Sequence, residues 1–193
     1  DHIFAAKLVG DGVAFMPDGR HLASAGKEDT ALVIQQGVSS EASSNLRQGV
    51  LGLVAAAPGV RKTSAGTPLV SSEAVQILPV RALGDSRIAN VQVRGVGDNV
   101  FELRPELRVS AGRAFNPGSD EVMIGSALVG RYEGLELDST FELEPKRPSR
   151  VVGVFSAAGS SFESEIWAGL HAVQTATNSE GFVASVTARL ESA

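Results

Sequence analysis

Short strands dominate the pattern of apolar and polar positions along the chain. Positions 90–94 and 140–144 alternate between apolar and polar side chains, which is the period of a strand with one buried face. The run 150–155 is denser in apolar residues and predicts a more deeply buried strand. The stretches 30–36 and 185–190 read as a first and a last strand. The chain is therefore expected to be rich in β-structure.

Apolar residues recur at helical spacing in fewer places. From 45 to 57 they fall on one face of a helix, with a serine available as N-cap and the proline and glycine at 58–59 ending it. A short helix is predicted to open at 125–126, and another to run from 160 to 172. With the strand before it and a return strand at 60–64, the first helix makes a β-α-β unit. The sequence thus predicts a mixed fold, α+β in class.

The composition is that of an ordinary globular domain and excludes several classes of partner and site. Of 193 residues, 43% are hydrophobic and 20% charged, which is enough apolar material for a core. The net charge is -5, with 17 basic residues scattered among 22 acidic ones, and this argues against nucleic acid or an anionic membrane surface as a partner. Cysteine is absent, which excludes disulfides and cysteine metal sites. No apolar stretch approaches the ~20 residues that span a bilayer, so we expect a cytoplasmic protein or a segment whose membrane helices lie elsewhere in a longer chain.

Candidate catalytic groups do not converge. His2, His21 and His171 lie far apart, without the paired spacing of metal ligands. The S-x-x-K pattern at 24–27 lacks its companion motifs, and neither a G-x-S-x-G elbow nor a P-loop occurs. We therefore expect no catalytic residue, no metal and no cofactor.

Glu163 lies in the helix predicted from 160. Ser160 precedes it by three residues, so the two residues predict a capping box, in which the carboxylate reaches back to a backbone N–H near the helix start. A buried ion pair with Arg113 or Arg150 is an alternative. A catalytic acid is the third, although Glu165, two positions away on a helix, would point in a different direction.

Several short motifs follow one another between 24 and 190. They are TALVIQQG at 30–37, APGV at 57–60, VRGV at 93–96, GRAFNPG at 112–118, EVMIG at 121–125, VVGVF at 151–155 and FESEIW at 162–167. Their order and spacing resemble the periplasmic core domain of MacB-like and FtsX-like ABC-transporter permeases. Residues 1–12 have no counterpart in this resemblance.

The resemblance implies a domain of two lobes. A porter-like β-α-β lobe would comprise 30–66 and 183–193, and a mostly β lobe with short helices, at 67–182, would be inserted in it. Residues 1–29 are expected to form an N-terminal arm. After residue 190 the resemblance implies a further helix and strand that would complete the porter-like lobe.

The resemblance also implies a non-catalytic role in transport. Such a domain lies outside the bacterial inner membrane, in the periplasm, between transmembrane helices of the same permease, and it relays motion driven by a separate cytoplasmic ATPase subunit. A periplasmic adaptor and a lipidic or hydrophobic substrate are the implied partners, in efflux or in lipid and lipoprotein transport. The structural residues that the family motifs indicate are Gly112, Arg113, Phe115, Pro117, Gly118, Glu121, Gly125, Gly153, Phe155, Glu163, Glu165 and Trp167.

The GRAFNPG motif is expected to be architecture rather than a ligand site. Pro117 and Gly118 suit a tight turn, and Phe115 is a natural core anchor. We expect the isolated domain to be a monomer, because permeases of this type are expected to pair through their membrane helices. Two other functions stay open on the sequence: a hydrolase or other enzyme with an unrecognised site, and a free-standing periplasmic interaction protein.

Overall fold

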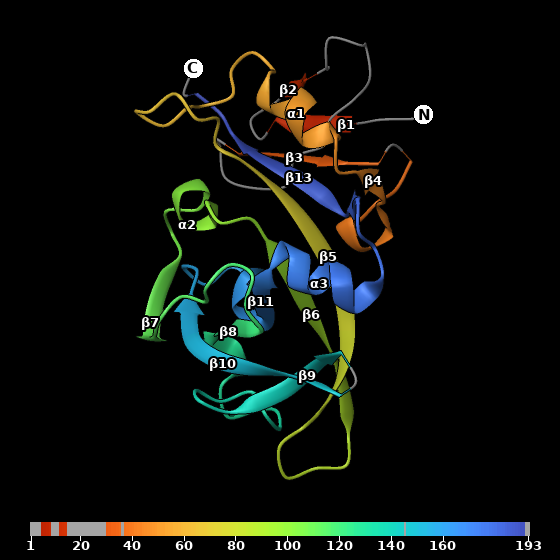
Figure 1. Ribbon diagram of the computed structural model, residues 1–193, viewed down its shortest axis with the longest axis vertical. Helices are drawn as coiled ribbons and strands as arrows, with labels where there is room; N and C mark the ends of the chain where they lie inside the picture. The colour runs from red at the N-terminus through yellow and green to blue at the C-terminus, as the bar shows by residue number, and fades with distance from the viewer. Residues whose placement is uncertain (1–4, 9–11, 15–29, 36, 145, 192–193) are drawn as a thin grey trace. The chain divides into compact units, whose positions relative to one another are not determined.

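The computed structural model describes residues 5–8, 12–14, 30–35, 37–144 and 146–191 (Figure 1). The chain divides into two compact units, one made of residues 1–74 and 181–193 and the other of residues 75–180. Strand β5 (Val70–Arg81) begins in the first unit and ends in the second. Helices and strands occur in both units, which confirms the predicted mixed α+β class.

An antiparallel sheet forms the first unit, with the strand order β2-β1-β3-β13-β5. Val33 lies opposite Val186 in the centre of this sheet, and neither residue is exposed to solvent. Strands β1 and β2 belong to the predicted N-terminal arm, and the remainder of that arm lies outside the described residues. The strands that complete the sheet are β1 (Ala5–Leu8), β2 (Gly12–Ala14), β3 (Thr30–Ile34) and β13 (Ser185–Arg189).

The helix predicted at 45–57 is shorter than expected. Helix α1 covers only Val50–Ala55 and lies against β13, and a 3-10 turn, η1 (Glu41–Ser43), precedes it. Strand β4 (Leu46–Arg47) replaces the first predicted turn and pairs antiparallel with β12 (Phe182–Val183). Glycines at 49 and 52 weaken the helix, so the strand partner decides the conformation of the residues before it.

The return strand predicted at 60–64 is reduced to isolated bridges. Val60 pairs with Leu190, and Lys62 pairs with Pro68. Because Pro68 has no backbone N–H to donate, this pairing cannot extend as a regular ladder.

A mixed sheet forms the second unit, in the order β5-β6-β11-β8-β10-β7, with β9 on β10 (Figure 1). Strand β11 runs parallel to β6 and antiparallel to β8, and β10 runs parallel to β8. Strands β7 and β9 pair antiparallel with β10. The strands are β6 (Ile88–Val96), β7 (Arg108–Gly112), β8 (Glu121–Gly125), β9 (Thr140–Glu144), β10 (Arg147–Ser156) and β11 (Glu165–Gly169). The helices are α2 (Val100–Leu103), α3 (Leu170–Thr177) and the 3-10 turns η2 (Ser126–Leu128) and η3 (Ser161–Ser164).

The predicted helix at 160–172 is wrong. The segment folds as the 3-10 turn η3, the strand β11 and the helix α3, which begins at Leu170. Strand β11 is central, with β6 on one side and β8 on the other, and all five of its residues are buried. A short strand covered on both faces has no alternation of polar and apolar residues, so its pattern cannot be told from that of a buried helix.

The helix predicted to open at 125–126 is a single 3-10 turn. It covers Ser126–Leu128; Leu128 and, further along the chain, Leu135 are buried, while Tyr132 is half-buried.

Candidate functional site

The structural residues singled out from the family motifs, from Gly112 to Trp167, all lie in the second unit, whereas the motifs at 30–37 and 57–60 belong to the first. The structure brings Phe115, Phe155 and Trp167 together in one core cluster. The core position predicted for Phe115 is confirmed, since this residue is 8% exposed. The other members of the cluster are Val96, Val100, Leu107, Met123, Val152 and Ala157, with Phe101, Ala114 and Phe162 packed against it.

Three motif glycines lie where the backbone of another segment comes close. A side chain at Gly153 would collide with the carbonyl oxygen of Arg113, and one at Gly125 would collide with the backbone of Glu163. Gly112 has a φ of 67°, which L-residues with a side chain rarely adopt, and a side chain there would meet the carbonyl of Val152. Because these glycines have no side chain, the neighbouring backbone segments can lie this close to strands β8 and β10.

Arg113 and Glu121 form an exposed clamp around the NPG turn. The guanidinium donates to both carboxylate oxygens, at 2.8 and 2.5 Å, and the backbone N–H of Asn116 donates to Glu121 Oε2 at 2.9 Å. The turn has the predicted position, with a φ of 77° at Gly118. The hydrogen bonds from Arg113 and Asn116 favour the ionised carboxylate, and they lower the pKa of Glu121 to about 2.

Glu165 is the centre of a buried polar network. Its carboxylate accepts Arg94 Nε at 2.8 Å and Arg94 NH2 at 3.1 Å, so the ion pair is bidentate. Gln92 Nε2 and Trp167 Nε1 also donate to it, at 2.6 and 2.8 Å. The side chains of Arg94 and Glu165 are only 2% and 7% exposed. The register explains the contact, because the parallel pairing of β11 with β6 sets Glu165 beside Gln92 and Trp167 beside Arg94.

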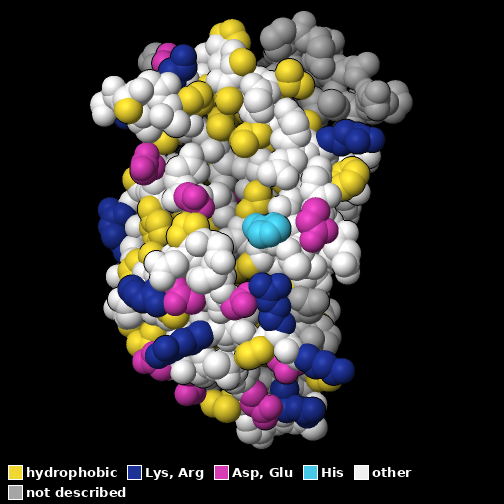
Figure 2. Space-filling model, viewed as in Figure 1, with side chains coloured by type: hydrophobic (Ala, Val, Ile, Leu, Met, Phe, Trp, Pro, Cys, Tyr) yellow, Lys and Arg dark blue, Asp and Glu magenta, His cyan; other side chains and the backbone are white. Residues whose placement is uncertain are grey.

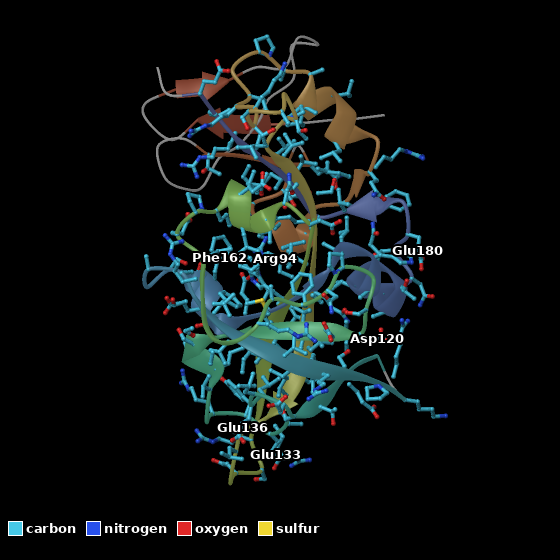
Figure 3. All side chains as sticks on the ribbon, turned by 60° about the vertical axis from the view of Figure 1, so that its left-hand side comes forward. Arg94, Asp120, Glu133, Glu136, Phe162 and Glu180 are labelled. Atoms are coloured by element: carbon cyan, nitrogen blue, oxygen red, sulfur yellow. The ribbon has the colours of Figure 1, made fainter. Side chains whose placement is uncertain are left out.

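Aromatic rings complete the surroundings of this ion pair, and Figure 3 labels one of them, Phe162, together with Arg94. The guanidinium carbons of Arg94 and Arg104 lie 5.2 and 5.0 Å from the ring centre of Phe162, within the range of cation–π attraction. Arg104 also lies 5.6 Å from the ring centre of Trp167, whose ring packs against Phe155 at 4.8 Å. Two buried arginines, one carboxylate and three aromatic rings thus form a single cluster.

Sequence reasoning identified only part of this cluster. It predicted Glu165, Phe155 and Trp167 as structural residues. Arg94 belongs to the VRGV motif but was not singled out, and neither were Arg104 and Gln92. The burial of Arg94 was not predicted, because this residue lies on the polar face of an alternating strand, and a polar face predicts exposure to solvent. The usable signal was Glu165, an acid beside the apolar run Ile-Trp-Ala-Gly, since a buried carboxylate requires a basic partner.

The Glu163 carboxylate binds backbone groups of a loop rather than those at the start of a helix. Its Oε1 accepts the backbone N–H groups of Ala157 and Gly159, at 2.7 and 3.0 Å. These two hydrogen bonds, that from Ala157 first, lower the pKa of Glu163. The predicted capping box is wrong in its geometry, because the Ser160 side chain makes no capping hydrogen bond and the carboxylate reaches past it.

The two arginines offered as alternative partners of Glu163 pair elsewhere. Arg113 binds Glu121, and Arg150 NH2 lies 2.9 Å from Asp138 Oδ1. Both pairs reach solvent. Figure 2 shows that acidic and basic side chains lie close to one another on one face of the second unit.

Neither a metal site nor a membrane helix is found in the described part of the chain. Among the described residues, no group of three or more histidine, aspartate or glutamate side chains is placed to hold a metal ion. Nor does this part of the chain contain a helix of the length and apolarity needed to cross a membrane.

The similarity of this chain to known proteins lies in its three-dimensional structure. No protein-family model and no curated protein matches the sequence. The structure is similar to the periplasmic region of MacB from Actinobacillus actinomycetemcomitans, with a TM-score of 0.57 and 15% identity, over 84% of this chain and 75% of that one. It is also similar to the extracellular domain of the noncanonic ABC-type transporter YknZ from Gram-positive bacteria, with a TM-score of 0.53 and 16% identity, over 100% of this chain and 85% of that one. The chain therefore has the fold of the periplasmic and extracellular domains of MacB-like ABC-transporter permeases.

Proposed function

We propose that this chain is a non-catalytic extracytoplasmic domain of an ABC-transporter permease. The observation that carries the proposal is the similarity to the YknZ extracellular domain, which extends over the whole of this chain and therefore over both units. In the permease, membrane helices of the same protein would anchor the domain, and a separate ATPase subunit in the cytoplasm would drive its motion.

The contacts of the motif residues support a structural role for them. Glu121, Glu163 and Glu165 each accept hydrogen bonds from neighbouring protein groups. Gly112, Gly125 and Gly153 pack closely against the backbone of other segments. A general acid or base would need to reach a substrate from a cleft. We therefore propose that the motif residues hold the second unit rigid, so that it can transmit motion and present a surface to a partner or substrate.

The location of the domain is tested by cysteine labelling. These 193 residues contain no cysteine, so a cysteine introduced at the exposed position Ala42 or Ser86 is the only one within its unit. In the full-length protein, a membrane-impermeant maleimide added to intact cells is expected to label both positions. Labelling only after the inner membrane is broken would place the domain in the cytoplasm and refute the proposal.

The relay role needs a measurement of motion. Spin labels at Ala42 and Ser86 report the distance between the two units in the full transporter in lipid. We expect the distance distribution to differ between the ATP-bound and nucleotide-free states. A Walker-motif variant of the ATPase subunit that cannot bind ATP is the control, and identical distributions in all states would exclude a relay.

A further inference from the structure

A pocket of about 530 Å³ opens between strands β5 and β9 in the second unit. This volume falls in the range of sites that hold ligands. None of the family motifs contributes to it. The lining residues are Leu78, Pro79, Val80, Arg81, Glu133, Gly134, Thr140, Phe141, Glu142 and Leu143.

The pocket is bordered by the edges of two strands. It is lined by four consecutive residues from β5, 78–81, and four from β9, 140–143. Successive side chains of a strand point to opposite faces, so a lining of four consecutive residues is what is expected where the edge of a strand borders a pocket. Within the described residues, β9 pairs with β10 alone, and the pairing of β5 with β13 stops at Glu73. Figure 1 shows β9 beside the lower part of β5.

One end of this slot already holds a short extended segment on β5. Tyr132 and Ala82 form an antiparallel bridge, and Glu133 N–H donates to the Arg81 carbonyl at 3.0 Å. Ala82 N–H, in contrast, donates to Arg87 on the β6 side, at 2.9 Å. Because backbone groups alternate in direction along an antiparallel strand, Pro79 directs its carbonyl into the slot, and Ile77, which lies next to the lining residues, directs its N–H and carbonyl to the same side. The edge of β5 thus accepts an antiparallel segment at 81–83, and the same edge continues into the pocket.

The walls of the slot suit alternating side chains. Val80 and Leu143 are buried, and Leu78 and Phe141 are half-buried, so the floor is apolar. The rim carries exposed charges. Arg81 and Glu133 lie 3.6 Å apart there, and the label in Figure 3 marks Glu133 at this end of the unit. Exposed Glu142 leaves the rim with an excess of negative charge, which favours a ligand with basic ends.

We propose that this slot binds an extended peptide segment of a partner protein, which adds as an antiparallel strand to β5 between β5 and β9. Main-chain hydrogen bonds would supply affinity, and alternate side chains would enter the apolar floor. Pro79 has no N–H, so it removes one bond from the ladder and restricts the register. This proposal rests on the proposed function only in assigning the peptide to an extracytoplasmic partner, and the binding itself is a property of the folded chain.

The test uses two matched peptides and the whole 193-residue chain. One peptide alternates valine and threonine between terminal lysines, and the other carries N-methyl groups on the amides of one edge. Calorimetry is expected to show saturable binding of the first peptide, and binding of the second weaker by at least about tenfold, the equivalent of one net hydrogen bond. Hydrogen exchange is expected to slow at the Ile77 amide and in β9.

A variant that should gain affinity separates strand addition from a merely structural effect. Pro79 is exposed, and Pro79→Ala restores an N–H to the slot edge, so the unmethylated peptide is expected to bind several-fold more tightly. The proposal is overturned if neither peptide binds saturably, if both bind equally, or if exchange slows instead in β7, whose five residues are all exposed. Cysteine labelling in intact cells is independent of these outcomes, so failure of the strand site and failure of the proposed function are distinguishable.

Discussion

Two arginine–carboxylate pairs in the second unit have the same chemistry and different surroundings. Arg94 and Glu165 meet in the core, with side chains 2% and 7% exposed. Arg113 and Glu121 meet at the surface, where the two side chains are 52% and 18% exposed. Both pairs are bidentate, and in both the carboxylate accepts further donors. Burial is therefore the variable that separates them.

The comparison shows that the same interaction, a bidentate arginine–carboxylate pair, has different consequences for stability in the core and in a surface loop. In the core, removing one partner leaves the other as an uncompensated charge away from water, which is strongly unfavourable. At the surface, water and salt replace a lost partner, and exposed ion pairs contribute little. We therefore expect the buried pair to decide whether the unit folds, and the exposed pair to tune the local order of the NPG turn.

Removing Glu165 should produce the largest effect. Glu165→Ala leaves Arg94 buried without its carboxylate and also removes the acceptor of Gln92 and Trp167. We expect a loss of about 3–5 kcal/mol in the free energy of unfolding, measured by urea denaturation. A loss below about 1 kcal/mol, the usual ceiling for an exposed pair, would break the distinction between the buried and the exposed pair.

The double variant Arg94→Met, Glu165→Leu sharpens the same point. Replacing both charges with apolar groups of similar volume is often neutral or stabilising, even where either single change is severe. We expect the double variant to recover most of the stability lost in Glu165→Ala. If it is as unstable as the single variant, packing or the Trp167 hydrogen bond dominates rather than the unpaired charge.

Trp167→Phe addresses the hydrogen bond without removing the charge. The indole N–H donates to Glu165 at 2.8 Å inside the core, and phenylalanine keeps an aromatic ring in contact with Phe155. Hydrogen bonds to charged groups are worth more than neutral ones, so we expect a loss of about 1.5–3 kcal/mol in unfolding free energy. The matched control is Phe162→Leu, which reduces the aromatic contact with Arg94 and leaves the donors to Glu165 in place.

The exposed pair predicts a pH dependence. The pKa of Glu121 is lowered from 4.5 to about 2 in the folded protein, chiefly by the hydrogen bond from Arg113. The stabilisation is therefore fully present above about pH 4.5 and is lost as pH falls toward 2. Glu121→Gln should flatten the fall in melting temperature over this window, with a smaller difference in high salt. Parallel curves for the two proteins would show that the clamp adds no stability.

The sequence predicted a turn and an outer strand of the second unit better than its central strand. The turn at Pro117-Gly118 and the strand at 140–144 follow from local chemistry, since proline presets one turn position and alternation marks a strand with one buried face. Strand β11 has a helix-like pattern because it is covered on both faces, and nothing local to its sequence specifies the neighbours that bury it. Tertiary packing, rather than local sequence, decides the conformation of that segment.

The candidate site shows the same limit. Gly112 and Gly125 could be singled out from the family motifs, but their close approach to Val152 and Glu163 is a long-range contact. Arg94 lies 71 residues from its partner, so its burial depends on the register between β6 and β11. The pocket between β5 and β9 has no sequence signature at all, because it arises where two separate strand edges come close.

Glu163 should give the smallest effect and tests which kind of cap it forms. Its Oε1 accepts Ala157 and Gly159 N–H groups, so the amide oxygen of Glu163→Gln can accept both, whereas Glu163→Ala leaves both without this acceptor. These hydrogen bonds lower the pKa of Glu163, so they favour the charged form of the carboxyl. The glutamine variant should therefore lose a little stability above the ordinary pKa of a glutamate carboxyl, and none in acid, where that carboxyl is protonated. We expect faster exchange of the Ala157 and Gly159 amides in the alanine variant and near-normal exchange in the glutamine variant.

Ser160→Ala is the decisive control. A capping box requires the serine hydroxyl, but here that hydroxyl is buried and makes no capping bond, so its removal should cost no stability. Destabilisation by Ser160→Ala, or equal damage from glutamine and alanine at 163, would show that the helix cap or the charge itself, rather than the loop hydrogen bonds, holds this segment.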